Sequence, residues 1–254
     1  MRIMTCNIWG DYFDNPVEAR TDAYEKLFCE YAPDIAGIQE CTPSWYGCSL
    51  FENVSDNYGL VKVTENNYTP ILVKKERFSI EKSGFYLYKD TPDPSKGYTY
   101  LVLCDKKTGE RIGAVNTHFW WKTGPEHDII RNSNAQEFTA VIKKINAEYG
   151  CPVFAFGDLN CGYEADVFNI FKSSGIKLAI DEAYKKDEYS SEHGDPVLKD
   201  DGKWHGIKTK DDKNNSLDHI ICYKNHCGIK EYRVVDVQYI LDASDHSPVY
   251  IDII

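Results

Sequence analysis

The chain has 254 residues, of which 40 are acidic and 29 are basic, so its formal net charge is −11. This length allows one large domain with a well-buried core, and we expect a single domain over residues 1–254. The negative charge disfavours sequence-independent binding to nucleic acid or to anionic membranes. The sequence has no run approaching the ~18 apolar residues of a membrane span, so no span is expected.

The cysteine pattern indicates a reducing compartment. The nine cysteines lack paired C-x-x-C spacings, and a chain of this length does not need disulfides for stability. The first residues lack the basic head, apolar stretch and cleavage site of a secretory signal, although a signal already removed would leave no trace. We therefore expect a cytoplasmic protein, and we expect it to be a monomer.

The N-terminal part predicts two strands separated by a helix. Residues 2–6 form an apolar strand that ends at Asn7. Residues 15–33 begin with a capping Asn followed by Pro, carry a helical apolar stripe and end in a second Pro. Residues 35–38 then form a second apolar strand, which leads to Glu40.

The middle of the chain predicts mostly strands. They are expected at residues 60–63, 70–74, 85–88 and 98–104. The last of these pairs with residues 111–117 in a hairpin whose connection contains Gly109. The second strand of this hairpin delivers Asn116 and His118 to its carboxyl end.

A long helix and a buried strand follow. Residues 125–149 have a helical apolar spacing and are followed by Gly150, a typical helix cap. The unbroken apolar run at 153–156 predicts a strand buried on both faces, because half-exposed strands alternate. Asp158 and Asn160 come just after it, where open α/β sheets place their chemistry. An isolated Asp-x-Asn can also be a turn that bonds only its own backbone.

The C-terminal part combines secondary structure with a polar segment. A short helix is expected at residues 165–174, and strands at 218–223, 231–239 and from 248 to 254. Apolar residues nearly vanish from Lys185 to Ser216, and a segment of this length inside a compact domain is usually functional or mobile. The whole pattern predicts an α/β fold with two packed mixed β-sheets and helices outside.

Polar residues recur at the carboxyl end or at the entry of the predicted strands. The nine are Asn7, Glu40, Asn116, His118, Asp158, Asn160, Asp218, Asp245 and His246. Each alone has a structural explanation, such as a surface carboxylate, a core histidine or a simple turn, but nine together indicate a shared site. Hard oxygen ligands suit Mg²⁺, and polar donors can meet the charge that develops on a phosphate. The set favours metal-assisted phosphoester hydrolysis.

Two other hydrolase classes fit the sequence less well. A zinc site is disfavoured because there is no H-E-x-x-H and because the cysteines lie inside predicted strands or helices. A Ser-His-Asp hydrolase is disfavoured because there is no G-x-S-x-G motif.

The motifs, in this order, resemble the endonuclease/exonuclease/phosphatase superfamily, which includes deoxyribonucleases, inositol polyphosphate 5-phosphatases and neutral sphingomyelinases. The matching pieces are Met-Thr-Cys-Asn-Ile-Trp, Ile-Gln-Glu40, Asn-Thr-His118-Phe, Gly-Asp158-Leu-Asn160, Ser-Leu-Asp218-His-Ile and Ser-Asp245-His246-Ser-Pro-Val. They extend from residue 4 to residue 249. The resemblance implies a four-layer α/β sandwich that binds Mg²⁺ or Mn²⁺, with Glu40 as the principal ligand, Asn7 beside it and Asp245 nearby.

The same resemblance implies roles for the remaining polar residues. Asp158 would position or deprotonate the attacking water, and Asn160 would hold a phosphate oxygen. His246, oriented by Asp218, would act as a base or contact the phosphate. His118 would bond the phosphate and help the leaving oxygen depart.

One position departs from the pattern of this superfamily. Many relatives carry an acid that bonds the histidine equivalent to His118, and the corresponding position here resembles Asn67. Without that acid, we expect His118 to lose an ionic partner that would keep it protonated.

The substrate is less specified than the chemistry. Candidates for substrate contact are Tyr68, Asn116, Trp120, Trp121 and Trp204. Because the chain is acidic and lacks a Lys/Arg stripe, we expect a small or lipid-derived phosphoester. The alternatives are a nuclease of the same superfamily that acts on DNA or RNA, and a catalytically silent binding protein on the same fold.

Overall fold

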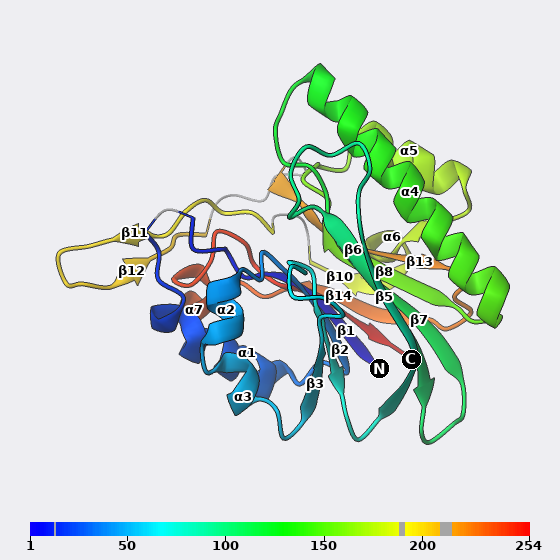
Figure 1. Cartoon of the computed structure of the whole chain (residues 1–254), viewed down its shortest axis with the longest axis horizontal. Helices are drawn as coiled ribbons and strands as arrows, with labels where there is room; N and C mark the ends of the chain where they lie inside the picture. Colours follow the sequence, from blue (N-terminus) through cyan, green and yellow to red (C-terminus); the bar gives the residue numbers. More distant parts are fainter. Residues whose placement is uncertain (13, 188–190, 209–214) are drawn as a thin grey trace.

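Two large β-sheets pack face to face in the computed structural model, which describes residues 1–12, 14–187, 191–208 and 215–254 (Figure 1). The first sheet contains β1 (Arg2–Asn7), β2 (Ile35–Gln39), β3 (Tyr58–Val61), β4 (Ile71–Lys74), β10 (Ala183–Lys186), β14 (Ile229–Val234) and β15 (Val249–Ile253). The second contains β5 (Phe78–Leu87), β6 (Gly97–Asp105), β7 (Arg111–His118), β8 (Val153–Asp158), β9 (Lys177–Leu178) and β13 (Asp218–Tyr223). A short hairpin of β11 (Val197–Leu198) and β12 (Trp204–His205) projects from one side (Figure 1).

Both sheets are mixed. Their strand orders are β10-β14-β15-β1-β2-β4-β3 and β5-β6-β7-β8-β13-β9. Within them β1 and β2, β7 and β8, and β10 and β14 pair in parallel, and the other described pairs are antiparallel. The carboxyl ends of β1 and β2 in one sheet, and of β7 and β8 in the other, are therefore available to a single site.

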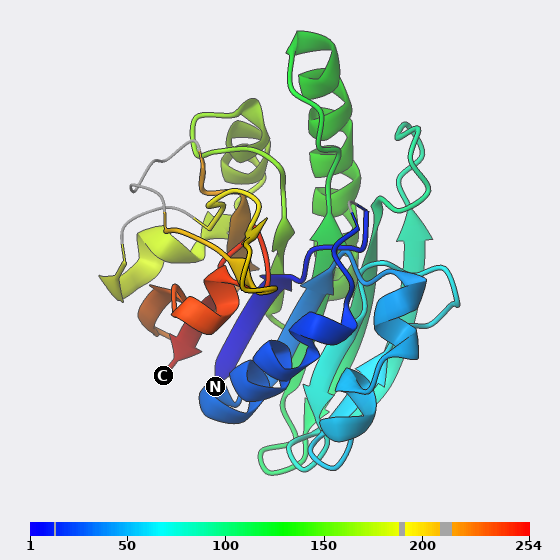
Figure 2. The same cartoon turned by 90° about the vertical axis from the view of Figure 1, so that its left-hand side faces the viewer.

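Helices cover the outer faces of the two sheets. On the side of the first sheet lie the 3-10 turn η1 (Glu18–Arg20), α1 (Thr21–Tyr31), α2 (Pro43–Gly47), α3 (Leu50–Asn53) and α7 (Gln238–Leu241) (Figure 1). On the side of the second lie α4 (Pro125–Tyr149), α5 (Asp166–Ser173) and, near β9 and β13, α6 (Ala179–Glu182). Figure 2 shows α4 extending beyond the sheets. The expected four-layer α/β sandwich is confirmed.

The sheets approach each other closely between β2 and β8. Phe156 is buried there, and a Cβ on Gly37 of the opposite sheet would lie 2.4 Å from its ring. A side chain at Gly37 would push the sheets apart, which is why the two strands need a glycine at this contact.

The structure corrects two predicted strands and one predicted helix start. The strand expected at 85–88 is the last part of β5, which begins at Phe78 and ends at Leu87. The strand expected at 231–239 ends at Val234, and residues 238–241 form α7, which buries Ile240 in the core beneath α1. The helix expected from Asn15 begins only at η1, whose N-cap is Val17 with no side-chain cap, and the Asn15 side-chain amide donates a hydrogen bond to the Gly10 carbonyl. By contrast, α4 begins and ends as predicted, with Gly150 in the left-handed region at φ 64°.

No helix in the described ranges combines the length and the apolar character needed to cross a bilayer. All nine cysteines lie in these ranges, and none of them forms a disulfide.

Candidate active site

Strand register brings three of the expected site residues into one row. In the parallel pair of β7 and β8, His118 is aligned with Asp158. In the antiparallel pair of β8 and β13, Asp218 is aligned with the same Asp158. The sequence positions of these residues are 40 and more apart, but hydrogen bonding between the strands places them side by side at one sheet edge.

Asp158 lies at the centre of the candidate active site and is buried. Its Oδ2 is 3.0 Å from Asn7 Nδ2, 3.3 Å from His118 Nε2 and 3.9 Å from His246 Nε2, and its Oδ1 accepts the Asn160 amide at 2.8 Å. Burial would raise the pKa of Asp158, but His118 and His246 outweigh it and hold the pKa well below its ordinary value. The carboxylate is therefore ionised and surrounded by donors.

His246 is held by a carboxylate on its other ring nitrogen. Its Nδ1 lies 2.6 Å from Asp218 Oδ2, which is the contact expected from the sequence. Burial would lower the pKa of His246, but Asp218, Asp245 and Asp158 together raise it well above its ordinary value. The contact with Asp218 also fixes the orientation of the ring, so that Nε2 faces Asp158.

Glu40 and Asp245 supply two further carboxylates beside this row. Glu40 follows β2 with φ at 59°, and its oxygens accept Asn7 Nδ2 at 3.2 Å and the Gly10 amide at 2.7 Å. Burial raises the pKa of Asp245; His246 opposes this shift and Glu40 adds to it. The two carboxylates therefore repel each other, and a divalent cation between them would offset that repulsion.

The donor set fits Mg²⁺ or Mn²⁺ better than a soft metal. Within the described ranges, no group of three or more His, Cys, Asp and Glu side chains is gathered closely enough to hold a metal ion unaided. Mg²⁺ is commonly held by only one or two carboxylates and keeps several waters, so Glu40 and Asp245 are side chains of the type that such a site uses.

Lys96 is a site residue that the sequence pattern did not reveal. Its ammonium is buried and lies 3.2 Å and 3.0 Å from the Nδ1 and Nε2 atoms of His118. Burial lowers the pKa of Lys96, although Glu40, Asp158 and Asp93 act in the opposite direction. The sequence feature that could have indicated Lys96 is its position just before β6. Because β6 pairs antiparallel with β7, Gly97 is aligned with His118.

Asn67 does not contact His118 in the way that the missing acid would. Its side chain accepts the Thr69 amide at 2.7 Å and donates to Thr99 Oγ1 at 2.7 Å, within its own loop and the adjacent strand. His118 instead has Asp158 on one side and Lys96 on the other. The carboxylate beside His118 is therefore that of Asp158, at 3.3 Å.

The structure gives Asn116 a different place from the substrate contact expected for it. Its side chain is fully buried between the sheets, where Nδ2 donates to the carbonyls of Ile38 at 2.7 Å and Pro70 at 2.9 Å. Asn116 faces the opposite sheet, as His118 does, but it lies two residues deeper along β7. Its amide ties the sheets together.

The aromatic candidates lie in different surroundings. Trp120 is buried, and its Nε1 donates to His127 at 3.0 Å, whereas 53% of Trp121 is exposed. Trp204 packs edge-on against Trp9, with ring centroids 5.8 Å apart. Tyr68 is half-buried in the loop before β4. Of the three tryptophans, Trp121 presents the most free indole surface.

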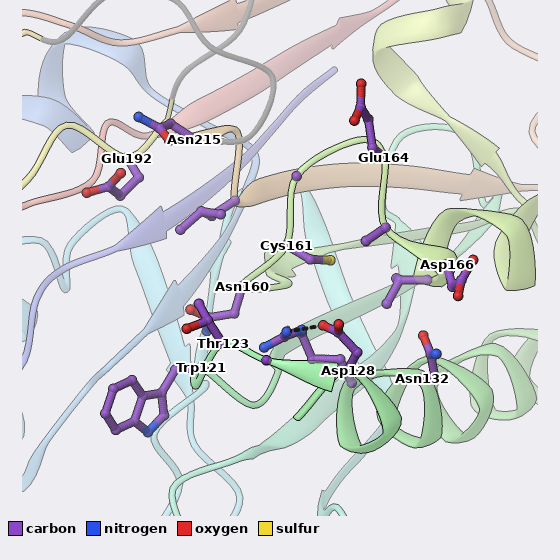
Figure 3. Close-up of a pocket in the computed structure, with 16 residues that line it drawn as sticks. Trp121, Thr123, Asp128, Asn132, Asn160, Cys161, Glu164, Asp166, Glu192 and Asn215 are labelled. Carbon is purple, nitrogen blue, oxygen red and sulfur yellow. Dashed lines mark hydrogen bonds and ion pairs between the residues drawn. The ribbon is translucent and has the colours of Figure 1, made fainter. Parts of the chain in front are cut away.

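A cavity of about 630 Å³ opens beside Asn160, with Trp121 at one end (Figure 3). We call it the Trp121 pocket. Its lining includes Trp121, Asp128, Asn132, Asn160, Glu164 and Glu192. It was not visible in the sequence, because its walls come from segments far apart along the chain.

Part of the polar segment expected from Lys185 to Ser216 packs against the site. The Ser191 hydroxyl accepts the Asp218 amide at 2.9 Å, and the Ser191 carbonyl accepts the Ser247 amide at 2.6 Å. The adjacent Glu192 bridges to His246 in an antiparallel pair. The segment thus supports the Asp218–His246 contact. Its stretches at 188–190 and 209–214 lie outside the described residues.

Comparison with known families identifies the chain. The sequence profile of the Endonuclease/Exonuclease/phosphatase family matches residues 4–246. The chain belongs to this family. Its members are hydrolases that act on phosphoesters, as the motifs implied. A search of curated protein sequences gave no significant match.

Solved structures share the fold of this family member over its whole length. A Bacteroides vulgatus endonuclease/exonuclease/phosphatase is 20% identical with a TM-score of 0.82, and the superposition covers 100% of this chain and 98% of that protein. A Bacteroides thetaiotaomicron mannosyl-6-phosphatase is 17% identical with a TM-score of 0.76, and its superposition covers 100% of this chain and 99% of that protein. TDP2 from D. rerio, bound to a single-strand DNA product, is 15% identical with a TM-score of 0.74, and its superposition covers 99% of this chain and 97% of that protein. These likenesses show the fold alone, which a sugar phosphatase and a DNA-binding protein both use.

Proposed function

We propose that this chain is a Mg²⁺- or Mn²⁺-dependent hydrolase of small phosphoric esters. The observation that carries the proposal is the position of Asp158, whose Oδ2 lies within 4 Å of Asn7, His118 and His246. A carboxylate surrounded by cationic and amide donors is suited to hold a water beside a phosphorus atom whose oxygens those donors contact.

The metal would be held by Glu40 and Asp245, with Asn7 beside Glu40. When bound, it would act as a Lewis acid on the phosphate oxygens. Glu40 is fixed for this task by hydrogen bonds from Asn7 and from the Gly10 amide, so that its carboxylate does not need to reorganise.

The remaining site residues would act on the ester itself. Asp158 would position the attacking water, and His246, oriented by Asp218, would contact the phosphate oxygens. His118 would contact the leaving oxygen, with its ring held beside Asp158. The side-chain amide of Asn160 donates to the Phe119 carbonyl at 3.1 Å and would have to turn to reach a phosphate oxygen.

Lys96 would supply a buried positive charge for the phosphate. Lys96→Met keeps the unbranched apolar stem and removes the charge, and we expect kcat/KM to fall on the order of 100-fold. The measurement is steady-state hydrolysis of the best substrate, with thermal unfolding to confirm that the variant folds. The control is Lys106→Met, since Lys106 lies beyond the opposite end of β6, where its ammonium donates to the Lys75 carbonyl. Full activity of the Lys96 variant would remove this residue from the mechanism.

Net charge supports a small ester over long nucleic acid. Binding of polymeric DNA releases counterions for each phosphate contacted, which makes affinity fall steeply with salt. For this acidic chain we expect kcat/KM to change less than about threefold between about 50 and 200 mM salt. Rapid cleavage of duplex DNA that collapses over this range would assign the chain to the nucleases instead.

A substrate screen tests the proposal directly. Hydrolysis would be measured with Mg²⁺ and with Mn²⁺ on aryl phosphates, inositol phosphates, sphingomyelin, RNA and DNA. We expect turnover of small esters that disappears with a chelator. The absence of turnover on every ester would favour the catalytically silent alternative.

Nine reduced cysteines further support the proposal that the protein acts in the cytoplasm, and we propose that it acts as a monomer.

A further inference from the structure

The Trp121 pocket adjoins the candidate active site and shares Asn160 with it. Asn160, in its wall, follows Asp158 by two residues and bonds it through its backbone amide. Leu217, also in the wall, directly precedes Asp218, and Glu192 pairs with His246. An ester whose phosphate is held beside Asn160 would place its organic part next to this pocket.

The charge of the pocket excludes a second phosphate. Four carboxylates line it, those of Asp128, Glu164, Asp166 and Glu192 (Figure 3). Among the described lining residues Arg131 is the one basic side chain, and its guanidinium is already engaged by Asp128 and by the carbonyls of Trp120 and Lys122. The carboxylates of the described lining outnumber this one guanidinium, so a polyanion such as an inositol polyphosphate or a nucleic acid strand would be repelled here.

A cationic headgroup is also a poor match. Binding of quaternary ammonium groups relies on aromatic faces, usually several of them around the cation. Within the described part of the lining, Trp121 is the one aromatic residue, and Lys122 Nζ already lies 5.6 Å from the centroid of its ring. This ammonium would repel a second cation at the indole.

The polar groups of the lining match hydroxyl groups. Carboxylates accept hydrogen bonds only, whereas the amides of Asn132 and Asn215 and the hydroxyl of Thr123 both donate and accept. Neighbouring hydroxyls on a carbon ring need this mixture, and the C–H face of such a ring can pack on the exposed indole of Trp121.

We propose that the Trp121 pocket binds a neutral polyhydroxylated group, so that the substrates are phosphate monoesters of sugars or polyols. This inference rests on the proposed function and specifies its substrate class. Trp121 determines specificity by packing on the sugar ring, and the carboxylates of Glu164 and Asp166 accept hydrogen bonds from the hydroxyls of that ring.

The first test compares glucose 6-phosphate and mannose 6-phosphate with methyl phosphate, whose leaving group is too small to fill the pocket. We expect kcat/KM for a hexose phosphate to exceed that for methyl phosphate at least about 10-fold in the wild type. Trp121→Ala should remove most of this ratio through KM. Tyr184→Ala is the matched control, because Tyr184 is 77% exposed on β10 and does not line the pocket, and it should leave the ratio unchanged.

The second test measures binding without turnover. In Asp158→Asn, calorimetry should show hexose 6-phosphate binding at least about 10-fold more tightly than inorganic phosphate. Equal affinities, or a ratio that Trp121→Ala does not change, would overturn the subsite. Preference for phosphocholine or an inositol bisphosphate would overturn it as well.

Hydrolysis of methyl phosphate with no preference for sugars would leave the proposed function standing. If no ester is hydrolysed, the proposed function fails, and the binding measurement still decides the subsite.

Discussion

Asp158→Asn is expected to lower kcat at least about 100-fold, which is the size of effect seen when a group that acts on a reacting proton is removed. The carboxylate accepts hydrogen bonds on both oxygens, from Asn7 on one and from the Asn160 amide on the other. An asparagine has a single acceptor oxygen, so at least one of these donors would lose its partner.

The same substitution is expected to affect stability only modestly. One unsatisfied buried donor costs about 1–3 kcal/mol, which a domain of this size should tolerate. Turnover would be measured alongside thermal unfolding, so that a loss of folded protein is not read as a loss of chemistry.

Asp105→Asn is the matched control for this prediction. Asp105 is also buried and accepts several hydrogen bonds, from Arg77 and from the amides of Lys107 and Thr108. It lies at the far end of β6, roughly 26 Å along the strand from Gly97. This variant should lose stability and keep kcat. If Asp158→Asn also keeps normal kcat on the best substrate, Asp158 does not act on the attacking water.

Glu40→Gln is expected to weaken Mg²⁺ binding at least about 10-fold and to abolish most turnover at the same time. Glutamine preserves the shape of the side chain but removes the charge that a hard cation requires. Metal affinity would be measured by calorimetry with Mg²⁺ or by electron paramagnetic resonance with Mn²⁺, independently of activity.

The two readouts distinguish an enzyme from a silent binding protein. Glu65→Gln is the control, because Glu65 is highly exposed and pairs with Lys62, and it should change neither readout. Unchanged metal affinity in Glu40→Gln would show that Glu40 is not a ligand. A wild-type chain that binds no metal and hydrolyses no ester would support the silent alternative.

The positions of the site residues along the strands were largely predictable from the sequence. Apolar runs are local signals, so the ends of β1, β2, β7 and β8, and with them Asn7, Glu40, His118 and Asp158, could be located without tertiary information. The bounds of α4 were predictable for the same reason, since a proline and a glycine mark its two ends.

The roles of neighbouring residues were less predictable, because side chains two residues apart on a strand share a face. Asn116 and His118 both face the opposite sheet, but the depth at which the sheets close decides that Asn116 ties them together and His118 lines the site. In the same way Trp120 is buried against His127 while the adjacent Trp121 is exposed.

By itself, the sequence determined the α/β class, most strands, the long helix and the polar residues that follow the strands, because these depend on interactions between residues close along the chain. Only the tertiary structure decided which distant segments meet: Lys96 beside His118, Ser191 behind Asp218, and the walls of the Trp121 pocket. The physical reason is that these contacts arise from strand pairing and sheet packing, whose geometry is set by the whole core and not by any local pattern.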